Sequence, residues 1–134
     1  MISKFNLEDS FEQEFKISED LVDGFTKLSG DKNPLHVNDI IAIQKGFKSK
    51  VIQGNLQNCF ISYFIGECLP IKDVMILYQD INFKKPLYLY DVLFLKVTII
   101  GIYESVGLIV FNFKFINQLD EVISKGKIKI KLTI

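Results

Sequence analysis

The sequence contains no arginine and no tryptophan, and its only histidine is His36. Its 16 basic residues, all lysine, balance 16 acidic residues, so the formal net charge is zero. Nucleic-acid-binding proteins usually carry a basic excess and read base edges largely with arginine. The composition therefore argues against a nucleic-acid partner.

Cysteine is almost as scarce, with Cys59 and Cys68 nine positions apart in an apolar stretch. No CxxC spacing and no histidine cluster accompanies them. We expect two buried free thiols in a reducing compartment, with no disulfide, metal ion or other cofactor. The N-terminus lacks the apolar run of a signal peptide, and no stretch approaches the ~20 apolar residues of a membrane span. These absences predict a cytoplasmic protein with no membrane contact.

Hydrophobic residues, by contrast, are abundant. They make up 49% of the 134 residues, and 12 of them are phenylalanine. This content is enough for one hydrophobic core and excludes a disordered chain. The length fits one domain and leaves little room for a second. We therefore interpret residues 1–134 as a single domain.

The first half of the chain shows mainly helical signals after one short strand. Residues 11–17 alternate between apolar and charged side chains, which predicts a half-buried strand. Ser18 is a typical N-cap for a helix that ends at Gly30. Asn38 can cap a second short helix that ends near Gly46.

The segment between these helices, Asp31 to His36, contains Pro34, which lacks a backbone donor. We therefore expect this segment to be a loop rather than a continuation of the helix. A third helix is predicted from Gly54 to about Leu69. Because its side chains are apolar on more than one side, we expect it to be buried.

The second half of the chain changes to the period of β-strands. Apolar residues alternate with polar ones in three segments, after a shorter apolar segment that ends near Phe83, and turns are expected at 104–105 and 117–120. The expected strands are 74–84, 92–100, 109–115 and 126–134. A strand, then helices, then a series of strands predicts an α+β protein, in which a curved antiparallel sheet wraps around the long helix.

One segment carries a specific motif. Phe25 to Ala42 reads FTKLSGDKNPLHVNDIIA. It resembles the signature of the MaoC-like (R)-specific enoyl-CoA hydratases and dehydratases: an aromatic residue, a small residue, G-D-x-N-P-L-H, and alanine six positions later. The resemblance implies a hot-dog fold, hydro-lyase activity on acyl thioesters, and catalysis by Asp31 and His36. Asn33 and Pro34 match the loop of the motif, and Asn33 is a candidate substrate-binding residue.

The chemistry of hydration is consistent with this assignment. An enoyl thioester needs a water molecule activated against C3 and a proton delivered to C2. Asp31 and His36, held on one short loop made rigid by Pro34, could grip one water from two directions. Taken alone, Asp-x-Asn-Pro is typical of a turn with a helix cap, and a lone histidine is more often structural. The complete motif favours catalysis.

Two residues near the third helix also match the family. The resemblance implies that the backbone N–H of Gly54 receives the thioester oxygen, although Gly54 could simply allow a tight helix entry. Ser62 matches a small hydroxyl near the active site, or it could hydrogen-bond to its own backbone. Gln53 departs from the pattern, because the family often has histidine there. The amide of Gln53 can donate and accept hydrogen bonds as histidine does, but it cannot carry a charge.

A lysine-rich loop precedes Gly54. Its side chains could meet phosphates of coenzyme A or of a carrier-protein arm, or they could simply be solvated. The lysines in question are Lys45, Lys48 and Lys50.

Alternative functions stay open on the same predicted fold. A hot-dog thioesterase would hydrolyse the same thioester without needing the D-x-N-P-L-H loop. A non-catalytic acyl-thioester-binding module would be expected to lose Asp31 or His36, and both are present. A dehydratase acting on an unusual acyl group is a third alternative. The resemblance also implies a homodimer whose sheets join edge to edge, while the acyl chain length and the carrier are left undetermined.

Overall fold

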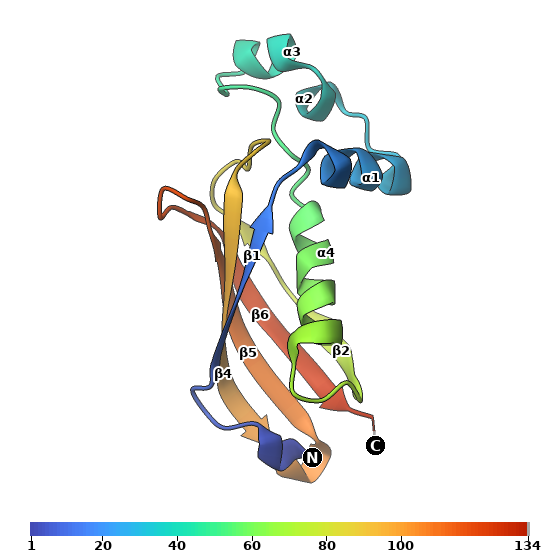
Figure 1. The fold of residues 1–134 in the computed structure, drawn as a ribbon, viewed down its shortest axis with the longest axis vertical. Helices are drawn as coiled ribbons and strands as arrows, with labels where there is room; N and C mark the ends of the chain where they lie inside the picture. Colours follow the sequence, from blue (N-terminus) through green and yellow to red (C-terminus); the bar gives the residue numbers. More distant parts are fainter. Residues whose placement is uncertain (134) are drawn as a thin grey trace.

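The computed structural model describes residues 1–133, and it contains one antiparallel sheet with helices on one face and across one end (Figure 1). The strand order is β1-β4-β5-β6-β2, and the short β3 pairs with β6. The strand bounds are β1 (Ser10–Lys16), β2 (Val74–Gln79), β3 (Asn82–Phe83), β4 (Val92–Tyr103), β5 (Leu108–Ile116) and β6 (Val122–Leu132).

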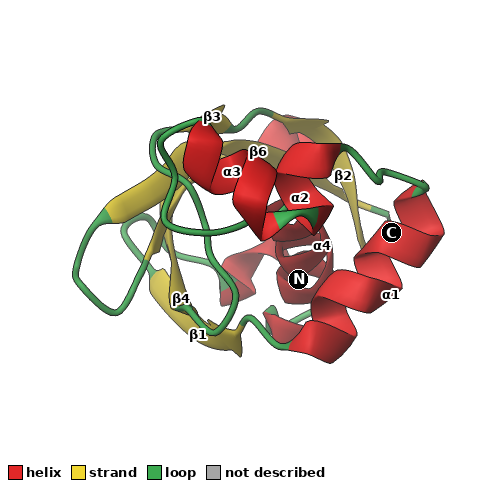
Figure 2. Ribbon diagram, turned by 90° about the horizontal axis from the view of Figure 1, so that it is seen from above, coloured by secondary structure: helices red, strands yellow, loops and turns green. Residues whose placement is uncertain are grey.

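Four α-helices lie between β1 and β2: α1 (Glu19–Ser29), α2 (Pro34–Val37), α3 (Asp39–Gln44) and α4 (Leu56–Tyr63). A π-helical turn, Phe64–Cys68, continues α4 in the same direction, and 3₁₀ turns occupy Ile2–Lys4 and Glu104–Val106. Helix α4 runs along the sheet, whereas α1, α2 and α3 gather over one end of it (Figures 1 and 2). The long helix predicted from Gly54 to about Leu69 is therefore confirmed, with slightly narrower bounds.

The core lies between the sheet and α4. Alternate residues of the long strands point into it, as the period of two predicted. In β4, Leu93, Leu95, Val97 and Ile99 are at most 1% exposed. Phe60 of α4 stacks on Phe15 of β1, with ring centroids 4.2 Å apart. The expected α+β architecture, a curved antiparallel sheet around a central helix, is confirmed.

Helix α4 buries one side and leaves the other open, whereas the sequence predicted burial nearly all round. Leu56 and Ile61 are buried against the sheet, but Tyr63 is 49% exposed. The prediction of two buried thiols was also wrong, because Cys59 is exposed and Cys68 is only partly buried. The physical reason is that the sheet packs against only one side of α4, so the residues on its other side remain exposed in the single chain.

The helix starts follow the predicted caps. Ser18 Oγ accepts a hydrogen bond from the Leu21 N–H at 3.2 Å, and Gly30 ends α1 in the left-handed conformation with a φ of 74°. Asn38 caps α3 in the same manner as Ser18 caps α1.

The expected loop from Asp31 to His36 is wrong in part, because Pro34 begins α2 and His36 lies on that helix. Proline suits the first helical position, where no backbone donor is needed.

Three of the four strands predicted in the second half are present and longer than their sequence pattern indicated, whereas the strand expected at 74–84 is divided into β2 and β3 at residues 80–81. Strand β6 begins at Val122 instead of residue 126, and β4 reaches Tyr103. Ile134, placed in the last strand by the sequence, lies outside the described residues. No helix within residues 1–133 combines the length and apolar character needed to cross a membrane.

Candidate active site

Asp31 and His36 lie together at the end of the sheet covered by α1 and α2. The His36 Nδ1 atom is 2.7 Å from the backbone oxygen of Val51. A carbonyl oxygen only accepts, so Nδ1 carries the proton in this contact and Nε2 is the unprotonated nitrogen of the neutral ring. The Nε2 atom faces Asp31 Oδ2 at 3.6 Å.

The distance between these two atoms exceeds that of a direct hydrogen bond. A water molecule can lie beside the pair at hydrogen-bond distance from both atoms. The side chain of His36 is 18% exposed and that of Asp31 is 41% exposed, so solvent and substrate can reach them. The two groups can therefore hold and deprotonate one water molecule.

The Asp31 loop is held by a series of side-chain-to-backbone hydrogen bonds. The Asp31 N–H donates to Ser29 Oγ, and Asp31 Oδ1 accepts from the Asn33 N–H, both at 3.1 Å. Asn33 Oδ1 in turn accepts from the Leu35 N–H at 3.1 Å and caps α2. The structure thus gives Asn33 a capping contact, and its substrate-binding role stays a prediction.

Val51 fixes the position of α2 from the other side. Its N–H donates to the Leu35 carbonyl at 3.0 Å, while its own carbonyl accepts from His36. The next residue, Ile52, donates to the Leu87 carbonyl at 2.8 Å. This arrangement connects the imidazole to the sheet side of the molecule and leaves little freedom for the ring to turn.

Gln53 also anchors the loop. Its Nε2 atom donates to Thr26 Oγ1 at 3.0 Å and to the Asp31 backbone oxygen at 3.2 Å. The residue is 2% exposed, and its Oε1 atom has no hydrogen-bond partner among the described residues. The glutamine that departs from the family pattern therefore holds the Asp31 loop directly.

Gly54 and His36 line one cleft of about 350 Å³, whose other walls are mostly apolar. A Cβ atom at Gly54 would lie 2.8 Å from the Phe83 ring, so the lack of a side chain lets β3 approach the start of α4. Within residues 1–133 the Gly54 N–H donates to no acceptor of the chain, and Asn55 makes no side-chain cap at the start of α4. Gly54, whose N–H is unpaired within residues 1–133, thus lines the same cleft as His36.

The sequence comparison decides the family. The family model described as the MaoC like domain matches residues 5–105. The chain belongs to this family. It is 34% identical over 96 residues to an (R)-specific enoyl-CoA hydratase of Rhodospirillum rubrum, covering 72% of this chain and 67% of that protein. It is 30% identical over 84 residues to a 3-hydroxybutyryl-CoA dehydratase of Methylorubrum extorquens, covering 63% of this chain and about half, 54%, of that protein.

Solved structures confirm the hot-dog fold for this MaoC-like chain. An R-hydratase of Pseudomonas aeruginosa in the unliganded form superimposes with a TM-score of 0.90 and 24% identity, covering 98% of this chain and 84% of that one. An (R)-hydratase of Aeromonas caviae gives a TM-score of 0.89 and 23% identity, covering 96% and 97% of the two chains. The likeness therefore extends well beyond the family motif.

Other predicted residues of the MaoC-like chain lie away from the cleft. Ser62 is on the exposed side of α4 and does not line the cleft that contains His36, so its role stays a prediction. Lys48 places its Nζ atom 4.8 Å from the centre of the Tyr88 ring, and the Lys50 N–H donates to Asp39. The lysines that line the cleft are instead Lys84 and Lys85.

Gln57 is a cleft residue that the sequence analysis missed. It is 1% exposed, and its Oε1 atom accepts a hydrogen bond from the buried Ser124 hydroxyl. A glutamine three positions after Gly54, on a helix face that is otherwise apolar, was the signal that could have identified it.

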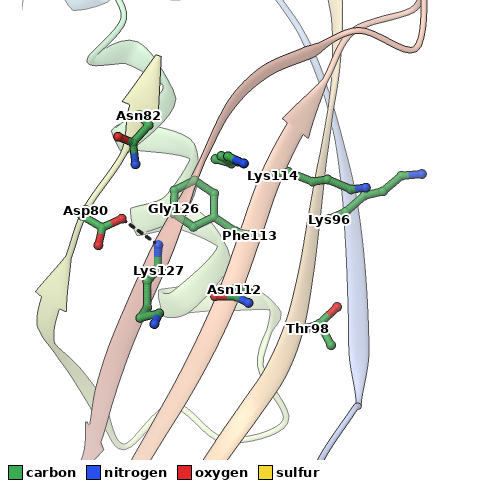
Figure 3. A pocket seen from close by; sticks show the side chains of 10 residues that line it. Asp80, Asn82, Lys96, Thr98, Asn112, Phe113, Lys114, Gly126 and Lys127 are labelled. Carbon is green, nitrogen blue, oxygen red and sulfur yellow. Dashed lines mark hydrogen bonds between the residues drawn. The ribbon is translucent and has the colours of Figure 1, made fainter. Parts of the chain in front are cut away.

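A larger hollow, about 450 Å³, lies on the face of the sheet opposite α4 (Figure 3). Lys96, Lys114 and Lys125 are directly opposite one another on three adjacent strands. Asp80 is the acidic residue of the hollow, and its two carboxylate oxygens accept from the Lys127 N–H and the Tyr78 hydroxyl. No histidine lines this hollow, so the Asp31–His36 pair of the family motif lies outside it.

Proposed function

We propose that this protein is an (R)-specific hydratase/dehydratase that interconverts trans-2-enoyl thioesters and (R)-3-hydroxyacyl thioesters. The observation that carries the proposal is the 3.6 Å approach of His36 Nε2 to Asp31 Oδ2 beside the cleft that contains Gly54. Family membership and the names of two relatives, an (R)-specific enoyl-CoA hydratase and a 3-hydroxybutyryl-CoA dehydratase, support the same chemistry.

In the hydration direction, a water molecule beside Asp31 and His36 attacks C3 of the enoyl thioester. One proton of the water passes to the pair, whose two facing atoms are a carboxylate oxygen and the unprotonated Nε2. The C3–O bond forms while the C2–C3 π electrons move toward the thioester carbonyl. The proton then returns from the pair to C2, so one water molecule is consumed and nothing else is required.

Val51 gives the histidine its function in this scheme. Because the Val51 carbonyl oxygen accepts a hydrogen bond from Nδ1–H, with 2.7 Å between nitrogen and oxygen, the lone pair of the neutral ring is on Nε2, which faces Asp31. The same hydrogen bond stabilises the imidazolium formed when Nε2 takes the proton. The ring is therefore prepared to receive and return one proton without rotating.

The thioester oxygen gains negative charge during the addition and needs a donor. We assign this role to the Gly54 N–H, which makes no hydrogen bond within residues 1–133. Its position just before α4 adds the positive end of the helix dipole. The substrate would thus be held with C3 toward the Asp31–His36 pair and the oxygen toward Gly54.

A homodimer is part of the proposal. Strand β2 ends the sheet, and its large side chains remain exposed: Met75 by 50%, Leu77 by 54% and Tyr78 by 46%. A long apolar edge strand is a template for pairing with another strand. A second copy of the chain, joined at β2, would cover both this edge and the open side of α4. The substrate would be an acyl thioester of coenzyme A or of a carrier protein in the cytoplasm, with no metal ion or prosthetic group.

The proposal is tested with a panel of trans-2-enoyl-CoA substrates of increasing chain length, followed at the absorbance of the conjugated thioester. Loss of that absorbance should produce a 3-hydroxyacyl-CoA that serves an (R)-specific but not an (S)-specific dehydrogenase. A purely (S) product would contradict the stereochemistry. Release of free coenzyme A without a 3-hydroxyacyl product would indicate a thioesterase.

A further inference from the structure

Gln57 occupies an unusual position for a polar residue. It is 1% exposed, yet it lines the cleft together with His36 and Gly54. A buried amide costs stability unless its donors and acceptor are satisfied. An amide atom of Gln57 that has no partner in the protein therefore indicates which kind of ligand group the cleft could bind.

Only one end of the amide is satisfied by the protein. The Ser124 hydroxyl, wholly buried on β6, donates to Gln57 Oε1. This contact fixes the orientation of the amide, because its oxygen faces β6 and its NH₂ group must face elsewhere. Within residues 1–133 the Nε2 atom makes no hydrogen bond, and it is not among the fully enclosed unpartnered atoms. The NH₂ group therefore faces the open space of the cleft.

The helix directs this group toward Gly54. Gln57 is three residues after Gly54, and its N–H donates to the Gly54 carbonyl at 3.0 Å, so the two residues share one turn. Side chains on a helix lean toward its N-terminus and cover the preceding turn. The amide of Gln57 accordingly lies over the start of α4, where the Gly54 N–H is also without an acceptor.

We propose that Gln57 is a second hydrogen-bond donor to the thioester carbonyl oxygen, acting together with the Gly54 N–H, with Ser124 as the residue that positions its amide. This inference rests on the proposed function, since both donors would bind the same substrate oxygen. Two converging donors are needed because the oxygen has two lone pairs and gains charge during the addition. The donors act most strongly on the enolate, so the amide contributes to rate more than to substrate binding.

The test compares Gln57→Met, which keeps the length of the side chain but removes both donors, with Gln57→Glu, which keeps the acceptor for Ser124. The matched control is Asn58→Leu, because Asn58 is the next residue of α4 and its amide bonds to Asn55 and Gln79 instead of facing the cleft. With the best enoyl-CoA substrate, kcat should fall about a hundredfold in both Gln57 variants, while KM changes by less than about threefold. The control should keep kcat close to the wild-type value.

A spectroscopic measurement distinguishes a hydrogen bond from Gln57 to the thioester carbonyl from a role of Gln57 in packing alone. A saturated acyl-CoA labelled with ¹³C at its carbonyl binds without turnover, and each hydrogen bond to the oxygen lowers its infrared stretching frequency. The lowering should be smaller in Gln57→Met and Gln57→Glu than in the wild type. Ser124→Ala should give an intermediate frequency and an intermediate rate.

Two outcomes would overturn the inference. An unchanged kcat in both Gln57 variants would do so, as would a reduced kcat with an unchanged carbonyl frequency, which would indicate a packing role. If Gln57→Met does not fold, the result for Gln57→Glu, which is similar in size and polar, decides the question. A wild-type protein that hydrates no enoyl-CoA would refute the proposed function itself, whereas active wild type with unaffected variants would refute only the role of Gln57.

Discussion

Gln53 holds the backbone carbonyl of Asp31, with its side-chain Nε2 atom 3.2 Å from that oxygen. The two residues are 22 positions apart in the chain, on opposite sides of α2 and α3. The contact therefore fixes the Asp31 loop to the residue that precedes Gly54. It links the position of the proposed acid–base pair to the position of the proposed oxyanion donor.

Gln53→Leu should lower kcat about tenfold with little change in thermal stability. The rate falls because the Asp31 loop loses its tether and the Asp31–His36 geometry loosens. Stability changes little because the substitution also removes the buried, unpartnered Oε1 atom. Enzyme assays and thermal melts measure the two effects. Gln53→His, which keeps a donor, should restore most of the rate, and failure of this rescue would argue against a positioning role.

Asp31→Asn and His36→Ala should each reduce the hydration rate about a hundredfold or more, because each removes one of the two groups that transfer the proton. Asp31→Asn keeps an oxygen that can accept from the Asn33 N–H, so the loop should retain its shape. Circular dichroism should show native folds for both variants. A rate within a fewfold of the wild type in either variant would remove that residue from the mechanism.

Leu77→Lys should shift the protein from dimer to monomer. Leu77 is 54% exposed on the edge strand β2, where a partner copy would bury it, and a buried lysine there would be unpaired. Light scattering during gel filtration at micromolar concentrations gives the mass. Leu119→Lys is the matched control, because Leu119 is 65% exposed in the turn between β5 and β6. A wild-type protein that is monomeric and fully active would contradict the dimer.

Gly126→Ala should destabilise the fold by about 1–3 kcal/mol and lower the Tm by roughly 5–10 °C. A Cβ atom at this position would lie 2.1 Å from the Asp80 backbone oxygen and 2.7 Å from the Phe113 ring. The backbone between β2 and β3 would have to move to make room. Gly66→Ala is the control, because an added Cβ there meets nothing within 4 Å. Equal melting temperatures for the two variants would show that β3 can shift freely.

Activity should survive treatment with a metal chelator. The proposed reaction uses only a water molecule, the Asp31–His36 pair and backbone or amide donors. The measurement is the hydration rate after incubation with EDTA and removal of the chelator. Activity that disappears and returns with a divalent cation would refute a metal-free mechanism.

Local sequence determined most of the secondary structure of this protein. The caps at Ser18 and Asn38 and the left-handed Gly30 follow from the chemistry of single residues and their neighbours. The strands follow from apolar alternation, because a residue every two positions must face the same side of a sheet. Pro34 illustrates the limit of such rules. Its missing backbone N–H prevents α1 from continuing through it, but the same residue is well suited to the first position of α2.

The motif in the sequence also made Asp31 and His36 candidate catalytic residues, because its spacing is specific, and the resemblance to the family added Gly54. It did not indicate how these residues meet. The contacts of His36 with Val51 and of Asp31 with Gln53 join residues that are 15 and 22 positions apart in the chain. The periodicity of each segment does not determine which residues of distant segments come into contact.

Tertiary structure alone decided which polar side chains face the cleft and which face of α4 remains open. Ser62 and Gln57 lie on the same helix and both look acceptable for a polar role in the sequence, yet one is exposed and the other is buried beside Gly54. The direction of a helical side chain relative to the core depends on how the whole helix is rotated against the sheet. That rotation is set by the packing of residues such as Phe60 and Phe15 from distant strands and helices, which no local pattern encodes.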